Sequence, residues 1–141
     1  MIVLEINPQD TDEIIKDTCR SAGKLGLFPE FENYLQDESK FDDQLETFRG
    51  FIGLESVEFV RAYDTDSKEQ AFSIVRYPAY DVHMPGPGLV MMITISGAKD
   101  YALMRSVYKY LRKRCKDLNL KWYMDSRKTG EYRYENRYHI I

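Results

Sequence analysis

The sequence has few of the residues that build metal, cofactor and disulfide sites. Its 141 residues include two histidines and two cysteines, Cys19 and Cys115. No C-x-x-C or H-E-x-x-H pattern occurs, so we expect no metal site, and two cysteines in an unsecreted chain are more often buried thiols than a disulfide. The nucleotide-binding patterns G-x-x-x-x-G-K-S/T and G-x-G-x-x-G and the hydrolase pattern G-x-S-x-G are also absent. These absences predict a protein without cofactors and favour a non-enzymatic function.

Long apolar runs are also missing. The longest, from Leu89 to Ile95, is far shorter than the roughly 18 residues that a membrane-spanning helix needs. The apolar N-terminal run, from Met1 to Ile6, has no basic flank and no small-residue cleavage site, so it predicts a first strand and not a signal peptide. We therefore expect a cytoplasmic protein, or one incorporated in an assembly built there, that has no membrane partner.

Glycine and proline are scarce, which argues against disorder. Eight glycines and five prolines stand beside 43% hydrophobic, 13% aromatic and 30% charged residues, and no low-complexity tract occurs. A chain of this length and composition can bury a core of its own. We expect one ordered domain.

The residues that are present form periodic segments in a definite order. Apolar residues spaced by three and four predict helices, and alternating apolar residues predict strands. The predicted segments of the single domain 1–141 are an acidic helical region 10–53, a sheet 56–96, a basic helix 98–119 and a hairpin 120–141. The continuous apolar run 89–95 indicates a central strand that is covered on both faces. Because no βαβ pattern repeats, we expect an α+β fold with an antiparallel or mixed sheet of about five to six strands and helices packed mainly on one face.

The final hairpin is expected to join strands at 120–124 and 131–141 through a loop at 125–130. Side chains alternate between the two faces of a strand. One face of the last strand therefore carries Tyr132, Tyr134, Asn136, Tyr138 and Ile140, and the other carries Glu131, Arg133, Glu135, Arg137 and His139. We expect the tyrosines to pack against the core and the charged face to stay wet and open to a partner.

The net charge of −3 conceals a gradient along the chain. Residues 1–50 hold 12 acids and 5 bases, for a charge of −7, whereas residues 100–141 hold 5 acids and 11 bases, for a charge of +6. Opposite ends can attract each other within one fold, attract the ends of another copy, or present the basic part to phosphates. The sequence leaves these three alternatives open.

The predicted helix 98–119 has one apolar and one basic face, and the basic face dominates the expected binding surface. The expected binding residues are Arg105, Lys109, Arg112, Lys113, Lys116, Arg127, Lys128, Arg133, Arg137 and His139. The first hypothesis is a protein-binding or assembly subunit that self-associates head to tail, as a homo-oligomer, through its acidic and basic regions. The order of strands, long helix and hairpin loosely resembles the layout of small phage tail-terminator or connector subunits, a resemblance that no motif accompanies and that implies an assembly role.

The second hypothesis is a nucleic-acid-binding accessory protein that uses the same basic helix face. Its arginines and lysines could follow a phosphate backbone, but the tyrosines of the last strand are expected in the core and not stacked on bases. The isoelectric point of about 5.4 is also well below that of a typical nucleic-acid-binding domain. This hypothesis therefore rests on local basicity alone.

The third hypothesis is a small enzyme or ligand-binding protein with a site in the irregular segment 78–88, which holds three prolines and two glycines. Tyr80, Asp81 and His83 are its candidate catalytic residues, because an imidazole beside a carboxylate can transfer protons. No nucleophile is visible in the segment, and a histidine in such a loop is more often a surface or packing residue. The sequence identifies neither a reaction nor a substrate here.

Overall fold

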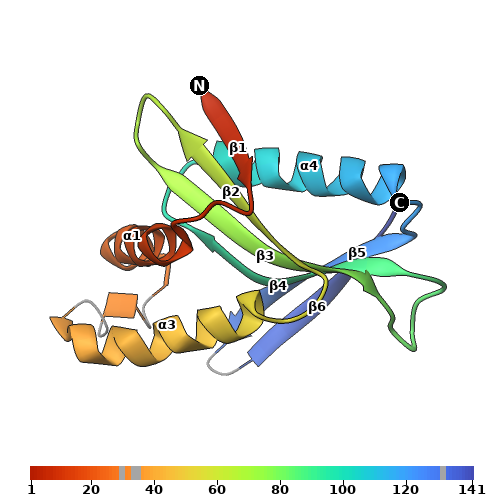
Figure 1. The fold of residues 1–141 in the computed structure, drawn as a ribbon, viewed down its shortest axis with the longest axis horizontal. Coiled ribbons are helices and arrows are strands. Elements are labelled where there is room, and N and C mark those ends of the chain that lie inside the picture. Colours follow the sequence, from red (N-terminus) through yellow and green to blue (C-terminus); the bar gives the residue numbers. More distant parts are fainter. Residues whose placement is uncertain (29–30, 33–35, 131–132) are drawn as a thin grey trace.

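The computed structural model describes residues 1–28, 31–32, 36–130 and 133–141. Its elements in chain order are β1 (Ile2–Ile6), α1 (Thr11–Lys24), α3 (Glu38–Ile52), β2 (Val57–Asp64), β3 (Gln70–Ala79), β4 (Gly88–Ser96), α4 (Ala102–Asp117), β5 (Trp122–Gly130) and β6 (Arg133–Ile140). Figure 1 shows the strands side by side in one sheet with helices on either side, and the predicted α+β class is confirmed. Among the described helices, none has both the length and the apolar composition needed to cross a membrane.

The six strands lie in the sheet in the order of the sequence, from β1 at one edge to β6 at the other. Neighbouring strands are antiparallel except β4 and β5, which are parallel. Parallel neighbours need a long crossover connection, and α4 supplies it. The sheet is therefore mixed, which is one of the two arrangements that the sequence predicted.

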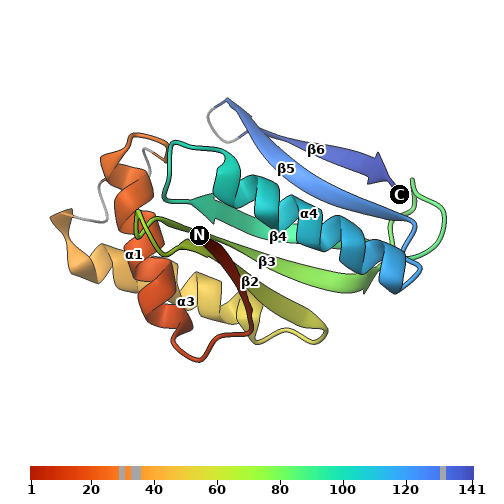
Figure 2. The same ribbon diagram turned by 90° about the horizontal axis from the view of Figure 1, so that it is seen from above.

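The helices cover both faces of this sheet (Figures 1 and 2). On one face, Val107 and Leu111 of α4 lie in a core with Val75 of β3. On the opposite face, Ile15 of α1 and Phe48 of α3 lie in a second core. Helices packed mainly on one face were expected, and the position of α4 departs from that expectation.

The strands themselves explain why both faces need a cover. In β3, Phe72 belongs to the core under α1 and α3, whereas Ala71 and Val75 belong to the core under α4. In β4, Leu89 and Ile95 likewise belong to opposite cores. Leaving either set uncovered would place apolar surface in water, which costs free energy in proportion to its area. The continuous apolar run of β4 therefore reflects cover on both faces, as predicted.

The first strand of the final hairpin is longer than predicted. β5 continues to Gly130, so the prediction of a loop at 125–130 is wrong. This segment pairs with β6, and the Ser126 hydroxyl donates to Asn136 Oδ1 at 2.7 Å. Cross-strand pairing outweighs the turn propensity of the aspartate, serine and glycine in the segment. Residues 131 and 132, which were predicted to begin the last strand, lie outside the described residues.

Candidate functional site

The sheet splits between its two parallel strands. In the described part of the chain, β4 and β5 pair only at Leu89 with Tyr123 and at Val90 with Met124. Beyond these positions β4 stays paired with β3 and β5 with β6, so the two strands move apart (Figure 2). The second half of each strand therefore has one edge that pairs with no neighbour across the split.

A β-bulge marks the point where the split begins. Ile74 pairs with Ile93 but Val75 pairs with Met91, which leaves Met92 as an extra residue in β4. A bulge bends its strand and increases the local twist. Because the bulge directly follows the last pairing with β5, we attribute the divergence of the two strands to it.

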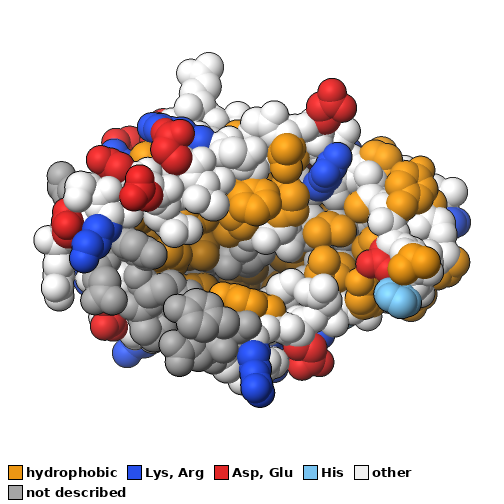
Figure 3. Space-filling model, turned by 90° about the horizontal axis from the view of Figure 1, so that it is seen from below, with side chains coloured by type: hydrophobic (Ala, Val, Ile, Leu, Met, Phe, Trp, Pro, Cys, Tyr) orange, Lys and Arg blue, Asp and Glu red, His pale blue; other side chains and the backbone are white. Residues whose placement is uncertain are grey.

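A groove of about 710 Å³ occupies the split. Its lining includes Phe48 and Phe51 of α3, Met92, Ile93 and Ile95 of β4, Tyr101, Met104 and Tyr108 at α4, and Ser126, Arg127, Lys128 and Tyr134 of the hairpin. Figure 3 shows a hollow with hydrophobic side chains on the face of the molecule where α3 lies. A mostly apolar lining with a few polar groups is typical of sites that hold a ligand or a protein segment.

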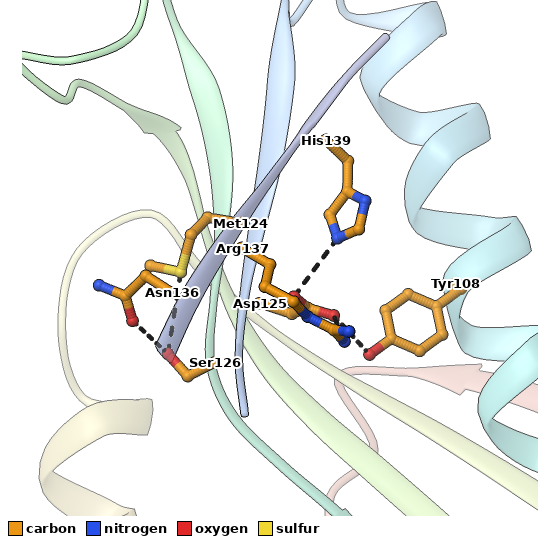
Figure 4. A network of polar contacts seen from close by, with 7 residues as sticks. All are labelled: Tyr108, Met124, Asp125, Ser126, Asn136, Arg137 and His139. Atoms are coloured by element: carbon orange, nitrogen blue, oxygen red, sulfur yellow. Dashed lines mark hydrogen bonds and ion pairs between the residues drawn. The ribbon is translucent and has the colours of Figure 1, made fainter. Parts of the chain in front are cut away.

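A buried carboxylate gathers its partners on the α4 side of the groove (Figure 4). Asp125 is 5% exposed, and it accepts hydrogen bonds from the Tyr108 hydroxyl at 2.9 Å and from Arg137 Nη2 and Nε at 3.2 and 3.3 Å. His139 Nε2 lies 3.3 Å from Asp125 Oδ1, and the imidazole stacks on the Tyr123 ring with centroids 4.4 Å apart. We call these five residues the Asp125 cluster. It ties the hairpin to α4.

The electrostatics of the cluster keep Asp125 ionised. Burial alone would raise its pKa, but the hydrogen bonds from Arg137, Tyr108 and His139 hold the pKa below the ordinary value of 3.8. Burial and the hydrogen bond to Asp125 both raise the pKa of the Tyr108 hydroxyl, which therefore stays protonated and donates. The negative charge of Asp125 is thus compensated by Arg137, and the cluster fixes the hairpin to α4.

The cluster does not form a catalytic triad with the neighbouring serine. Ser126 follows Asp125 in a strand, so its side chain points to the other face of the hairpin. Figure 4 shows it there, where its hydroxyl donates to Asn136 Oδ1. Asp125 and His139 are therefore adjacent without a serine nucleophile beside them.

Five of the predicted binding residues lie on the exposed side of α4. They are Arg105, Lys109, Arg112, Lys113 and Lys116, and we call them the α4 basic surface. Lys113 pairs with Asp117 at 3.1 Å, and Arg105 lies over the Tyr101 ring at 6.0 Å. Lys109, Arg112 and Lys116 form no ion pair with any residue that the structure describes. These three cations remain available to a partner.

The other predicted binding residues separate into three environments. Arg127 and Lys128 line the groove, Arg133 is exposed at the start of β6, and Arg137 and His139 belong to the Asp125 cluster. The structure thus brings only part of the predicted surface together.

The faces of β6 are covered only in part as predicted. Tyr134 is 64% exposed and does not pack in the core as expected, whereas Tyr138 is half-buried and packs edge to face on the buried Trp122 ring, with centroids 5.7 Å apart. The charged face instead meets α4 through Asp125 and Tyr108. The reason is that α4 covers one side of the hairpin, whereas the groove separates the tyrosine side from α3. Tyr132 lies outside the described residues.

The predicted site in the segment 78–88 lies apart from the groove. Tyr80 and His83 are exposed, and neither belongs to the groove lining. The Asp81 carboxylate accepts the Tyr138 hydroxyl at 2.5 Å and the His83 backbone N–H at 2.8 Å. The carboxylate therefore contacts the backbone of His83 and not its imidazole, which does not match the proton-transfer pair that the third hypothesis needs.

Comparison with known proteins adds no assignment to this geometry. No model of a protein family matches the chain, and no curated protein matches it. Among the described residues, no group of three or more His, Cys, Asp or Glu side chains is placed to hold a metal ion. The function must therefore be argued from the surfaces themselves.

The sequence did not predict the groove, because its walls come from segments that lie far apart in the chain. The apolar stripe of α3 contains Phe48, which lies in the core, and Ile52, which packs against it. Phe51 lies beside that stripe, and it lines the groove. This extra aromatic ring on an otherwise acidic helix was the signal that could have pointed to an open apolar surface.

Proposed function

We propose that the chain is a non-enzymatic protein-binding or assembly subunit. In this proposal it self-associates head to tail, with the α4 basic surface of one copy against the acidic region 10–53 of another. Nucleic acid is the competing partner for the same cations.

The observation that carries the proposal is that the two charged regions do not neutralise each other within one chain. Acids of the N-terminal region pair locally, as in Arg49 with Asp12 at 2.7 Å, and the hairpin pairs within itself through Arg137 and Asp125. Across the described residues, no ion pair joins an acid of 10–53 to a base of 98–141. α3 and α4 lie on opposite faces of the sheet (Figure 1), so intramolecular pairing between them is sterically prevented.

Surfaces of opposite charge on opposite faces of the molecule favour a head-to-tail contact, because each copy then offers one acidic and one basic surface. Such contacts close into a ring or continue as a filament, depending on the rotation between copies. Each exposed ion pair stabilises a contact by only about 0.2–1 kcal/mol, so several must act together. The three uncommitted cations of α4 can supply several at once.

Light scattering on protein eluting from a sizing column tests the proposal. At about 0.01 M salt the Debye length is about 30 Å, and at about 1 M it is about 3 Å. We expect a molar mass above that of the monomer at about 0.01 M salt and a clear decrease in molar mass at about 1 M salt. A molar mass that salt leaves unchanged would count against a charge-driven contact.

Two double variants locate the contact. Lys109→Glu with Arg112→Glu should abolish the low-salt species. Lys24→Glu with Lys40→Glu changes the net charge by the same amount but lies in the acidic region, so association should persist or strengthen. If both variants lose association equally, the net charge of the chain controls association and the α4 basic surface has no specific role.

The nucleic-acid alternative predicts a different result for the same proteins. Lys109→Glu with Arg112→Glu would weaken binding to a DNA duplex more than Lys24→Glu with Lys40→Glu, and affinity would fall linearly with the logarithm of salt concentration. Tight, salt-dependent duplex binding by a chain that stays monomeric at low salt would replace our proposal with this alternative.

A further inference from the structure

The segment 80–84 and the end of β6 form a projecting apolar feature. Val82 is 93% exposed, Tyr80 is 77% exposed and Ile140 is 69% exposed. Figure 3 shows hydrophobic side chains gathered at the end of the molecule where Figure 1 places this loop. We call these three side chains the apolar knob. Large apolar side chains that cluster at such exposure indicate a contact surface.

The knob is held in place by hydrogen bonds and is not a loose loop. The Tyr138 hydroxyl donates to Asp81 Oδ2 at 2.5 Å, and Trp122 Nε1 donates to the Gly86 carbonyl at 3.1 Å. The backbone N–H of Lys121 donates to the Pro87 carbonyl at 2.8 Å. A preorganised segment loses little conformational entropy on binding, so its apolar burial is converted more fully into affinity.

The knob and the groove open on the same face of the molecule. Tyr134 and Tyr138 share one face of β6 because they are four residues apart in a strand. Tyr134 lines the groove, and Tyr138 holds Asp81 beneath the knob. Figure 3 shows both the hollow and the apolar end from a single viewpoint.

We propose that two copies of the chain pair face to face, with the apolar knob of each inserted into the groove of the other. A projection and a receptor on one face generate a two-fold, self-complementary contact when one copy is turned by half a revolution. The contact closes on itself, so it produces a dimer and not a filament. It goes beyond the head-to-tail contact proposed above, because it uses different residues and apolar burial in place of charge.

Charge complementarity supports a second copy as the occupant. The groove carries Arg127 on its hairpin wall, and Asp81 stands between Tyr80 and Val82 of the knob. The hydrogen bonds from Tyr138 and the His83 backbone lower the pKa of Asp81, which is therefore ionised at neutral pH. The aromatic rings of Phe48, Phe51 and other lining residues match the valine and tyrosine of the knob in polarity.

The first test is the effect of Val82→Asp on the dimer at high salt, where charge-driven contacts are screened. We expect the wild-type chain to run at twice the monomer mass and the variant to raise the dimer dissociation constant by about tenfold or more, because burying a carboxylate among the apolar lining residues is costly and high salt screens its attraction to Arg127. Val82 is almost fully exposed, so the fold is not expected to change, and circular dichroism checks this. Leu118→Asp, at an exposed apolar position after α4, is the matched control and should leave the dimer intact.

The second test locates the contact by cross-linking. A chain with Val82→Cys and Thr47→Cys places one thiol on the knob and one on the α3 wall of the groove, and a short bis-maleimide should join two copies. A chain with Val82→Cys and Lys113→Cys carries its second thiol on the opposite face and should give no more product than Val82→Cys alone. Native Cys19 and Cys115 are buried, so they do not compete.

The outcomes separate this inference from the proposed function. A high-salt dimer that Val82→Asp dissociates, with cross-linking specific to position 47, supports the reciprocal pair. A chain that is monomeric at high salt and high concentration overturns it, as does a dimer that Val82→Asp leaves unchanged. If only the charge-reversed α4 variant loses association, the head-to-tail proposal stands and the reciprocal pair fails.

Discussion

Replacing Gly88 with alanine tests how the start of the split is held closed. Gly88 is buried at the beginning of β4, and a Cβ atom there would lie 2.2, 2.2 and 2.5 Å from three atoms of the Trp122 indole. Carbon atoms in contact normally lie about 3.5–4.0 Å apart, so the ring would have to move by about 1.3 Å. Trp122 is fully buried and donates its Nε1–H to the Gly86 carbonyl at 3.1 Å, so it has little freedom to move.

These contacts set the expected magnitude. Overpacking of this kind costs about 1–3 kcal/mol, and a weakened indole hydrogen bond adds about 0.5–1.5 kcal/mol, so Gly88→Ala should destabilise the fold by about 3 kcal/mol. Gly50→Ala is the matched control, because Gly50 lies inside α3 and a Cβ there meets nothing within 4 Å. That change should stabilise the fold by about 0.5–1 kcal/mol through the better helix propensity of alanine.

Urea unfolding measures both variants against the wild-type chain. Trp122 is the single tryptophan and is fully buried, so its fluorescence reports unfolding, and circular dichroism provides a second probe. With an m value of about 2 kcal/mol/M, Gly88→Ala should lower the midpoint by about 1.5 M, and Gly50→Ala should raise it slightly. A Gly88→Ala midpoint within about 0.3 M of wild type would refute the packing argument.

Two further predictions concern buried titratable groups. Tyr108→Phe removes the hydroxyl that donates to buried Asp125, and it should cost about 1–2 kcal/mol in urea unfolding, whereas Tyr80→Phe at an exposed position should cost nothing measurable. The pKa of Asp125 is lower in the folded chain than its ordinary value of 3.8, so its contribution to the free energy of unfolding is complete above that pH and is lost as the pH falls below it. Tyr108→Phe should weaken this loss of stability in acid. A variant whose free energy of unfolding depends on pH as the wild type's does would contradict the cluster. Burial raises the pKa of the Cys19 thiol to about 12 and that of Cys115 to about 11, so a thiol reagent at pH 8 should modify neither in the native protein and both in urea; rapid native labelling would contradict their burial.

Local periodicity predicted most of the elements because each is encoded within a short window. The apolar stripe of α4 and the two-sided burial of β4 both follow from local sequence pattern alone. Even the two faces of β6 were separated correctly, since alternation places Tyr134 and Tyr138 on one side and Arg137 and His139 on the other. Spacing therefore determines which residues share a face.

Spacing does not determine what covers each face, and this is where the prediction for β6 was wrong. Whether Arg137 or Tyr138 faces a helix depends on which side of the sheet α4 crosses between the parallel strands β4 and β5, and the spacing of residues does not contain that information. The groove depends on the same pairing and on one inserted residue, Met92. These are long-range features, and no short window of the sequence contains them. The expected loop at 125–130 was wrong for a related reason, because pairing with β6 decides its conformation.

Three features determine the shape of the split in the sheet. At its closed end, the close approach of Gly88 to Trp122 holds β4 against β5, and no larger residue than glycine fits there. Directly after the last pair, the bulge at Met92 turns β4 away from β5, and the Asp125 cluster fixes the hairpin to α4 so that the groove cannot collapse toward that side. The groove is therefore held open by two features, the bulge and the Asp125 cluster. An apolar surface that is held open in this way costs free energy in an isolated chain, so we expect a contact to cover it, and the proposed pairing with the apolar knob of a second copy would do so.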